Sequence, residues 1–260
     1  MTAKNEDKVT IDEEACIGCG LCVRSCIASC IAVDESSGKA KIVSDGCFGC
    51  GHCFASCPQS AIKMRGVKPE EVRQFDPSKP LLDFETLVGH IQTRRSIRHY
   101  QQRPIPRELI EKLISASRHA PTARNMEKVV YLVISDQKVL DQIRECAVEL
   151  FKLDARYSRL VQKGDFILRS APALILAHSP WGAADTGIAL ETIELIAPTL
   201  GLGSCWAGLV MHAAEKSPAL KQLIEHLGLP GPVQGGLMIG FPDEVYLRAP
   251  PRKMPQIVWA

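Results

Sequence analysis

The sequence of 260 residues lacks several features that would assign it to common protein classes. It contains no apolar run of 18 or more residues without charges, so no membrane span is expected. It also has no large excess of charge of either sign, since the formal net charge is +2. Residues 1–66 carry 7 basic and 8 acidic side chains, and residues 67–260 carry 24 and 21. Neither part is basic enough to indicate binding to nucleic acid.

Other absences narrow the chemistry. Nothing at the N-terminus resembles a secretion signal, so the eleven cysteines indicate a reducing, cytoplasmic location. No GxGxxG follows a predicted strand, which argues against a separate nicotinamide-binding domain. His99, His119, His178 and His212 are scattered and are interpreted as surface or core residues, so no catalytic acid–base residue is predicted. His52 lies inside a cysteine loop, where hydrogen bonding is its expected role.

Cysteine spacing is the most informative feature that is present. Eight cysteines form two copies of the spacing C-x-x-C-x-x-C-x-x-x-C. Three thiolates two residues apart wrap one face of a cubane, and the fourth has to come from elsewhere. This is the run of bacterial two-cluster ferredoxins, in which the fourth cysteine of each copy ligates the other copy's cluster. The expected ligands are Cys16, Cys19, Cys22 and Cys57 for one [4Fe–4S] cluster, and Cys47, Cys50, Cys53 and Cys26 for the second.

Zinc and disulfides are the alternatives for these cysteines. Zinc sites usually combine CxxC pairs or histidines rather than a CxxCxxC triple, and disulfides need an oxidising compartment. One departure from the ferredoxin pattern concerns the first run, which ends at Cys26 without the proline that follows Cys57. Cys30 lies four residues beyond Cys26 and competes with it as a ligand. Cys26 is preferred because its spacing matches the second copy, and Cys30 is interpreted as a small buried hydrophobe.

The chain divides by pattern into three parts: a two-cluster domain over 1–66, a proline-containing linker over 67–89, and a larger domain over 90–260. Residues 1–10 are expected to begin the first part as a loose arm. Short strands are predicted at 9–11, 31–33, 40–43 and 61–64. In the larger domain, helices are predicted up to about residue 94, after Pro106, over 137–163 and over 184–200. Core strands are predicted at 129–134, 173–177 and 237–239. Helices that alternate with strands imply an α/β or α+β domain.

Separated segments of the larger domain share one interpretation. They are Arg94–Arg98 (RRSIR), Ala120–Asn125 (APTARN), Gly201–Gly208 (GLGSCWAG), Gly240–Pro242 (GFP) and Pro250–Lys253 (PPRK). In this order and spacing they resemble the nitroreductase family of FMN enzymes, over roughly residues 90–255. The whole chain resembles a ferredoxin–nitroreductase fusion. The resemblance implies an α+β sandwich around a central, mainly antiparallel sheet, and a homodimer with its FMN sites at the subunit interface.

The arginine segment fits a flavin phosphate, which is a dianion that forked guanidinium donors bind in bidentate form. Arg94 and Arg98 are four residues apart and share one face if the segment is helical. The resemblance implies that the FMN phosphate and ribityl chain are bound by Arg94, Arg95, Ser96 and Arg98, with Arg252 and Lys253 completing the pocket. The alternative is a basic helix end that complements the helix macrodipole.

Two further segments are expected at the flavin ring. Pro121, Thr122 and Asn125 match the family's Pro-Ser-x-x-Asn turn, in which the asparagine bonds near the ring. Glu127 stands where the family often has glutamine. A carboxylate at this place is expected to alter the flavin potential or the preference for substrate. The resemblance implies that a backbone segment lies along the isoalloxazine and directs N–H donors towards N5. This segment consists of Trp206, Ala207, Gly208 and Leu209. Such donors stabilise the anionic reduced flavin. The alternatives are an Asx-turn loop, a helix C-cap and a core tryptophan.

The predicted function is that of an FMN-dependent oxidoreductase, which passes electrons between two [4Fe–4S] clusters and FMN to reduce a small organic acceptor of the nitroaromatic or quinone type. The electron donor is either NAD(P)H or an external reduced ferredoxin, and the covalent ferredoxin module favours the second. One alternative is an FMN site that oxidises NAD(P)H and exports electrons through the clusters. Others are a non-catalytic electron carrier and a redox sensor, which the retained arginines disfavour because a scaffold needs no phosphate clamp.

Overall fold

The computed structural model describes residues 8–76, 78–79, 81–154, 156–162 and 164–260. Most of the predicted N-terminal arm, together with Pro77 and Pro80 of the predicted linker, lies outside the described residues. The chain forms two compact units: a first unit of residues 1–80 and 124–126, and a second unit of residues 81–123 and 127–260. The predicted limits of the linker, residues 67 and 89, were drawn from the sequence pattern and stay a prediction.

The first unit is built from two copies of strand, cysteine loop, short helix and strand. β1 pairs antiparallel with β4, and β2 pairs antiparallel with β3. Each pair therefore joins one strand of the first copy to one strand of the second copy. The apolar side of these strands packs around the cysteines in a small core. The elements are β1 (Val9–Ile11), α1 (Leu21–Ser25), β2 (Ile31–Val33), β3 (Ala40–Ile42), α2 (His52–Ser56), β4 (Ile62–Met64) and a 3-10 turn at Pro69–Glu71.

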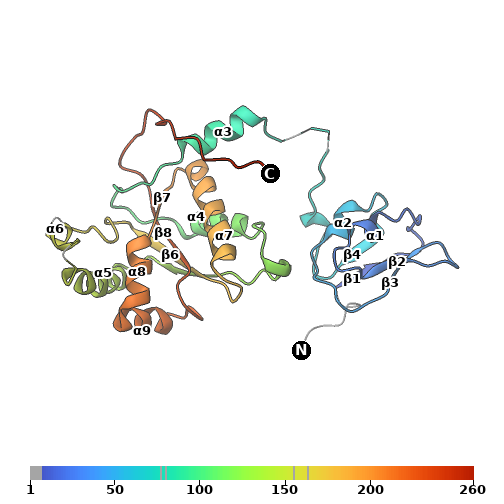
Figure 1. Ribbon diagram of the computed structural model, residues 1–260, viewed down its shortest axis with the longest axis horizontal. Coiled ribbons are helices and arrows are strands. Elements are labelled where there is room, and N and C mark those ends of the chain that lie inside the picture. Colours follow the sequence, from blue (N-terminus) through green and yellow to red (C-terminus); the bar gives the residue numbers. More distant parts are fainter. Residues whose placement is uncertain (1–7, 77, 80, 155, 163) are drawn as a thin grey trace. The chain divides into compact units, whose positions relative to one another are not determined.

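The second unit contains a four-stranded antiparallel sheet in the order β5-β6-β8-β7. Every residue of the two central strands, β6 and β8, is buried, since both sheet faces are covered by helices. Figure 1 shows these helices around the sheet. Its elements are α3 (Phe84–Thr93), α4 (Arg107–Ser117), a 3-10 turn at Ala123–Asn125 whose helical geometry is interrupted at Arg124, β5 (Val130–Ile134), α5 (Gln137–Lys152), α6 (Ser158–Val161), β6 (Ala173–His178), α7 (Ala183–Ile196), a 3-10 turn at Ala197–Leu200, β7 (Gly203–Trp206), α8 (Gly208–Lys216), α9 (Pro218–His226) and β8 (Gly235–Gly240).

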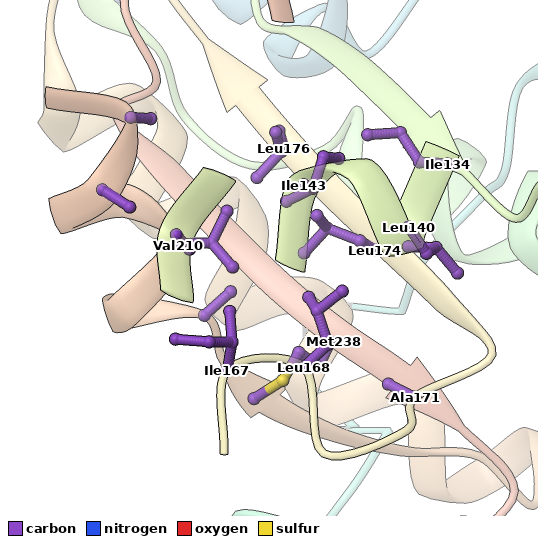
Figure 2. Close-up of a cluster of buried hydrophobic side chains, with 14 of the residues drawn as sticks. Ile134, Leu140, Ile143, Ile167, Leu168, Ala171, Leu174, Leu176, Val210 and Met238 are labelled. Atoms are coloured by element: carbon purple, nitrogen blue, oxygen red, sulfur yellow. The ribbon is translucent and has the colours of Figure 1, made fainter. Parts of the chain in front are cut away.

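Alternating side chains of the central strands separate two cores. On one face, Leu174 and Leu176 of β6 and Met238 of β8 pack with Ile143 of α5 and Val210 of α8 (Figure 2). On the other face, the intervening residues of β6 and β8 pack against α4 and α7. Because side chains alternate along a strand, a two-sided apolar sheet needs continuous apolar strands, which these sequences supply. The predicted sandwich with a mainly antiparallel sheet is therefore confirmed.

Local signals set several helix ends. Asp83, Asp136 and Ser217 each cap a helix by accepting a hydrogen bond from a first-turn backbone N–H. The helix predicted over 184–200 ends at Ile196 and continues as a 3-10 turn that contains Pro198, whose ring removes a backbone donor.

Within the described residues, no helix is both long and apolar enough to cross a membrane.

One strand was not predicted. Gly203–Trp206 was interpreted as part of a glycine-rich loop, whereas it forms β7, the edge strand beside β8. A Cβ at Gly203 would lie 2.4 Å from Cγ1 of Ile97, so the glycine permits the close approach of the segment around Ile97. This strand depends on long-range packing, which the local composition does not reveal.

Candidate functional site

The cysteines of the first unit line two separate cavities. One cavity is lined by Cys16, Cys19, Cys22 and Cys57, and the other by Cys26, Cys47, Cys50 and Cys53. These are the two ligand sets expected from the spacing, with the fourth cysteine exchanged between the copies. The thiols surround a space and do not converge on a point: among the described residues, no three His, Cys, Asp or Glu side chains could hold a single metal ion. Ligands spread around a cavity suit a multi-atom cluster.

Glycines shape both cysteine loops. Gly18 and Gly49 have φ of 68°, and Gly20 and Gly51, which precede α1 and α2, have φ of 73° and 74°. These left-handed conformations cost little only for glycine. Space is also limiting at one position, because a Cβ on Gly18 would lie 2.1 Å from the carbonyl oxygen of Gly38.

Backbone amides donate to the cysteine sulfurs in a pattern that both copies share. The N–H of Cys30 donates to Sγ of Cys26 (3.3 Å), and the N–H of Ala61 donates to Sγ of Cys57 (3.2 Å). Such donors favour the thiolate over the thiol and are one means of tuning an iron–sulfur centre. The four repeat cysteines that line each cavity, with N–H groups aimed at sulfur, therefore fit a [4Fe–4S] cluster in each cavity.

Burial works in the opposite direction at the thiols inside the helices. It raises the pKa of Cys22 and raises the pKa of Cys53 to about 11. By contrast, the backbone N–H of Ala40 beside Cys16 lowers the pKa of that thiol. Cys53 is a neutral thiol near pH 7 unless a metal displaces its proton, so cluster assembly would release protons there.

Cys30 is a fifth thiol in the second cavity. It is buried, with 2% of its surface exposed, and lines the same space as Cys26. Its Sγ lies 3.4 Å from Oγ of Ser44 and 3.4 Å from the carbonyl oxygen of Ala28. Cys30 takes the place in the first copy that buried Ala61 takes in the second, which agrees with its interpretation as a small buried side chain.

In the second unit, the arginine segment follows α3 but is not part of it. α3 ends at Thr93 and Arg94 is its extended C-cap, which agrees with the helix predicted to end near Arg94. The segment that follows is not helical, so the condition for a shared helical face of Arg94 and Arg98 is not met. The chain leaves the helix because it pairs with β7: Ser96 bridges Ser204, and the N–H of Ile97 donates to the carbonyl oxygen of Ser204 (2.9 Å). Long-range pairing thus fixes the course of the segment after the helix.

A buried carboxylate, which sequence reasoning missed, lies beside Arg94. The guanidinium of Arg94 is 3.6 Å from Oε1 of Glu194 in α7, and Oγ of Ser204 donates to the same oxygen at 3.0 Å. Burial raises the pKa of Glu194, while the bond from Ser204 and the charge of Arg94 oppose the rise. The sequence signal was a glutamate between apolar residues, Ile193 and Leu195, in the second half of α7.

The other predicted phosphate ligands are less closely grouped. The guanidinium of Arg95 lies 5.9 Å from the ring centre of Tyr246. Arg98 is exposed, and its charge opposes the rise that burial causes in the pKa of Cys205. Arg252 and Lys253 are exposed in the irregular segment after β8, and no hydrogen bond or ion pair connects them with other described residues. The structure therefore brings Arg94 and Ser96 together with β7. It does not connect Arg252 and Lys253 with this group.

The predicted ring loop is held by a second buried acid that was missed. Oδ1 of Asp185, in the first turn of α7, accepts the backbone N–H of Ala123 at 3.0 Å. Its Oδ2 accepts the hydroxyl of Ser179, also at 3.0 Å. Within the loop, Oγ1 of Thr122 accepts the N–H of Glu127 (3.0 Å). Asp185 is only 5% exposed, so it fixes the loop from inside the unit.

Asn125 is grouped differently from the rest of this loop. It belongs to the first unit, whereas Pro121, Thr122 and the other predicted flavin residues belong to the second. Arg124, Asn125 and Glu127 all have positive φ between 50° and 53°. Such values are uncommon outside glycine, and asparagine tolerates them best of the three.

The segment after β7 offers fewer backbone donors than predicted. The N–H of Ala207 donates to the carbonyl oxygen of Gly236 (2.8 Å), so it is already used within the protein. Gly208 and Leu209 open α8, and this helix end has no side-chain cap. The first-turn N–H groups of a helix lack intrahelical acceptors and carry a partial positive charge. Trp206 is 40% exposed and precedes them.

Comparisons with known proteins agree on both parts of the chain. The model of the nitroreductase family matches residues 91–241, and that of the 4Fe-4S dicluster domain matches residues 9–64. A protein of Archaeoglobus fulgidus, provisionally named NADH dehydrogenase/NAD(P)H nitroreductase, is 35% identical over 147 residues, which are 56% of this chain and 79% of that protein. The FMN reductase (NAD(P)H) of Bacillus subtilis is 29% identical over 65% of this chain and 70% of its own. The solved structure of an FMN-bound nitroreductase from Bacteroides fragilis matches with a TM-score of 0.60 and 22% identity, over 67% of this chain and 98% of that one.

Proposed function

Because the chain belongs to the nitroreductase family, we propose that it is an FMN-dependent oxidoreductase whose ferredoxin-type module holds two [4Fe–4S] clusters and supplies the electrons. The acceptor proposed is a small organic molecule of the nitroaromatic or quinone type. One observation carries the proposal: a single chain joins a 4Fe-4S dicluster domain to a nitroreductase domain. When bound, the clusters supply single electrons and the flavin couples them to two-electron chemistry.

The residues of the second unit have the donor set for a phosphate and a reduced flavin ring. Arg94, Arg95 and Arg98 supply guanidinium groups, and Ser96 supplies a hydroxyl. Pairing with β7 fixes this segment, and Glu194 holds Arg94 by one side of its guanidinium. The remaining donors of Arg94 are then presented in a fixed orientation, which suits bidentate phosphate binding.

On the ring side, we assign two parts of the second unit, the first turn of α8 and residues 121–123. The N–H groups of Gly208 and Leu209 would favour negative charge on the ring, as a helix N-terminus does. Asp185 acts indirectly, because it holds the backbone of the loop through Ala123. Arg252 and Lys253 are kept in the proposal only as ligands that a different conformation of the C-terminal segment would bring in.

A homodimer is part of the proposal. Large apolar side chains of α3 and of the C-terminal segment are exposed, including Phe84 (74%), Leu247 (82%) and Trp259 (88%). Exposed apolar side chains at this level favour contact with another chain, and a second copy is the partner that the family resemblance implies. Light scattering after gel filtration tests this, and a monomer at micromolar concentration would contradict it. The cytoplasmic location stays a prediction from cysteine content.

The composition of the purified protein tests the cofactor assignment. Under anaerobic conditions, we expect the purified protein to contain FMN and two clusters per chain, each with four iron atoms and four sulfides. Turnover of a nitroaromatic or a quinone, driven by reduced ferredoxin, tests the activity. Cys57→Ala should abolish that turnover and leave FMN bound, because Cys57 lines a cavity of the first unit, whereas the arginine segment and the first turn of α8 lie in the second. Full activity of Cys57→Ala with this donor would refute the clusters as the entry route.

A further inference from the structure

Two lysines occupy equivalent positions in the two copies of the first unit. Lys8 lies eight residues before Cys16, and Lys39 lies eight residues before Cys47. Each immediately precedes a strand, β1 after Lys8 and β3 after Lys39. Both side chains are half-buried. The lysines are thus part of the internal duplication, although they lie outside the cysteine motif.

Their contacts are exchanged between the copies. Nζ of Lys8 donates to the carbonyl oxygen of Cys47 at 2.8 Å, and Nζ of Lys39 donates to the carbonyl oxygen of Cys16. In each case the acceptor is the first cysteine of the other copy. The strand pairing explains the exchange, since β1 pairs with β4 after the second loop and β3 pairs with β2 after the first. The stem of Lys8 also lies over this loop, because its Cδ is 3.9 Å from the place of a Cβ on Gly49.

These two lysines differ from neighbouring lysines in the groups with which they pair. Lys41 and Lys63 pair with the carboxylates of Asp34 and Asp12. For Lys8 and Lys39, no ion pair with a carboxylate occurs within the part of the chain that the structure describes, and the ammonium meets a carbonyl dipole instead. A dipole satisfies hydrogen bonding without cancelling the charge. Among the described residues, each cysteine loop therefore has one ammonium against its backbone that is not ion-paired with a carboxylate. At Cys16, the charge of Glu13 acts in the opposite sense to that of Lys39.

A nearby positive charge changes the energy of reduction. Reduction adds one electron to a cluster, so the reduced form is more negative than the oxidised form. Net charge and hydrogen bonding around a cluster are recognised determinants of its potential, and the interaction is stronger in a half-buried setting than in water. An ammonium held at the loop favours the reduced form and makes the potential less negative.

We propose that Lys8 and Lys39 are paired tuning residues, each of which raises the reduction potential of the cluster held by the other copy's loop. Lys39 acts on the cavity of Cys16, and Lys8 acts on the cavity of Cys47. This inference rests on the proposed function, because it requires the two clusters assigned there. It adds residues outside the cysteine motif to the determinants of electron entry.

The test is an anaerobic redox titration of the full-length holoprotein with dithionite as the reductant, followed by EPR. Lys39→Met keeps the length of the side chain and removes its charge. We expect a more negative midpoint potential for one cluster and an unchanged potential for the other. Lys8→Met should shift the cluster that Lys39→Met leaves unchanged. Lys41→Met is the matched control, because Lys41 lies in the same strand segment and pairs with Asp34, and it should shift neither cluster.

Lys39→Arg separates charge from mere anchoring of the loop. The guanidinium keeps the positive charge, so the proposal predicts a potential closer to wild type than that of Lys39→Met. Unchanged potentials in Lys39→Met and Lys8→Met with full iron content would overturn the proposal. If Lys39→Met loses iron, Lys39→Arg decides: a wild-type potential supports the role of charge, and a lowered one overturns it. Wild-type protein without clusters would refute the proposed function itself, an outcome that iron analysis distinguishes beforehand.

Discussion

Replacing Asp185 is the perturbation that the structure defines best, because two hydrogen bonds end on this buried carboxylate. In Asp185→Ala, the hydroxyl of Ser179 and the N–H of Ala123 both lose their acceptor. Ser179 is fully buried, and leaving a buried polar group without a partner costs about 1–3 kcal/mol. Ala123 is half-buried, so water can replace part of its lost bond, at a cost of about 0.5–1.5 kcal/mol. We expect the free energy of unfolding to fall by about 2–4 kcal/mol.

The control is Asp136→Ala. Asp136 also accepts a single backbone N–H, from Val139, but it caps the exposed start of α5, where the loss should be about 1 kcal/mol. Asp185→Asn should fall between the two, since its amide keeps one acceptor oxygen. Urea unfolding of the three variants, monitored by circular dichroism, measures the differences.

The same change should affect the flavin, because Asp185 holds the loop that the sequence places at the ring. We expect the Kd for FMN, measured by quenching of flavin fluorescence, to rise about tenfold in Asp185→Ala, or ~1.4 kcal/mol. Asp136→Ala should leave it unchanged. An unfolding free energy within about 0.5 kcal/mol of the control, with an unaltered Kd, would refute the reasoning that Asp185 anchors this loop.

Three other changes test separate parts of the site. Arg98→Ala should weaken FMN binding by about tenfold or more, the loss of one charge-assisted bond; equilibrium dialysis against Arg118→Ala as an exposed control measures it, and an equal flavin content would refute the assignment. Cys30→Ala should keep the full iron content, while Cys57→Ala loses iron; loss of iron in Cys30→Ala would show that Cys30 is a ligand. Glu194→Gln should gain stability relative to wild type as the pH rises: burial raises the folded-state pKa of Glu194, so the wild type loses stability as the pH rises through that pKa, and the amide does not. Thermal unfolding from pH 4 to pH 8 measures this difference, and a constant difference would contradict it.

Local patterns in the sequence were sufficient for the features that depend on local spacing. The cysteine repeat groups the thiols as the two cavities do, because a CxxCxxC loop fixes where its own sulfurs lie. Ligation itself stays a prediction. The apolar strand at 173–178 was predictable because both of its faces are buried, which requires a continuous apolar run. The strand at 130–134 is only partly buried, and its β-branched residues indicated it.

Features that depend on long-range contacts were not predictable in this way. β7 and the extended course of Arg94–Arg98 arise together, since each pairs with the other. The local sequence of β7 indicated a glycine-rich loop, and that of Arg94–Arg98 indicated only that a helix ends near Arg94. Asp185 and Glu194 lie in α7, which the sequence predicted only as a long helix lined with small and apolar residues. Their partners are more than five residues away in sequence, so only the folded structure shows which hydrogen bonds compensate for their burial.

The central claim is that electrons enter at the clusters and reach the acceptor through the flavin. Anaerobic stopped-flow spectroscopy with reduced ferredoxin, NADH or NADPH tests it most directly, because cluster and flavin bands can be followed separately. The account predicts that reduced ferredoxin bleaches the clusters first and that the flavin follows. Direct reduction of the flavin by NAD(P)H, with the clusters following, would contradict it and would indicate that electrons leave through the clusters.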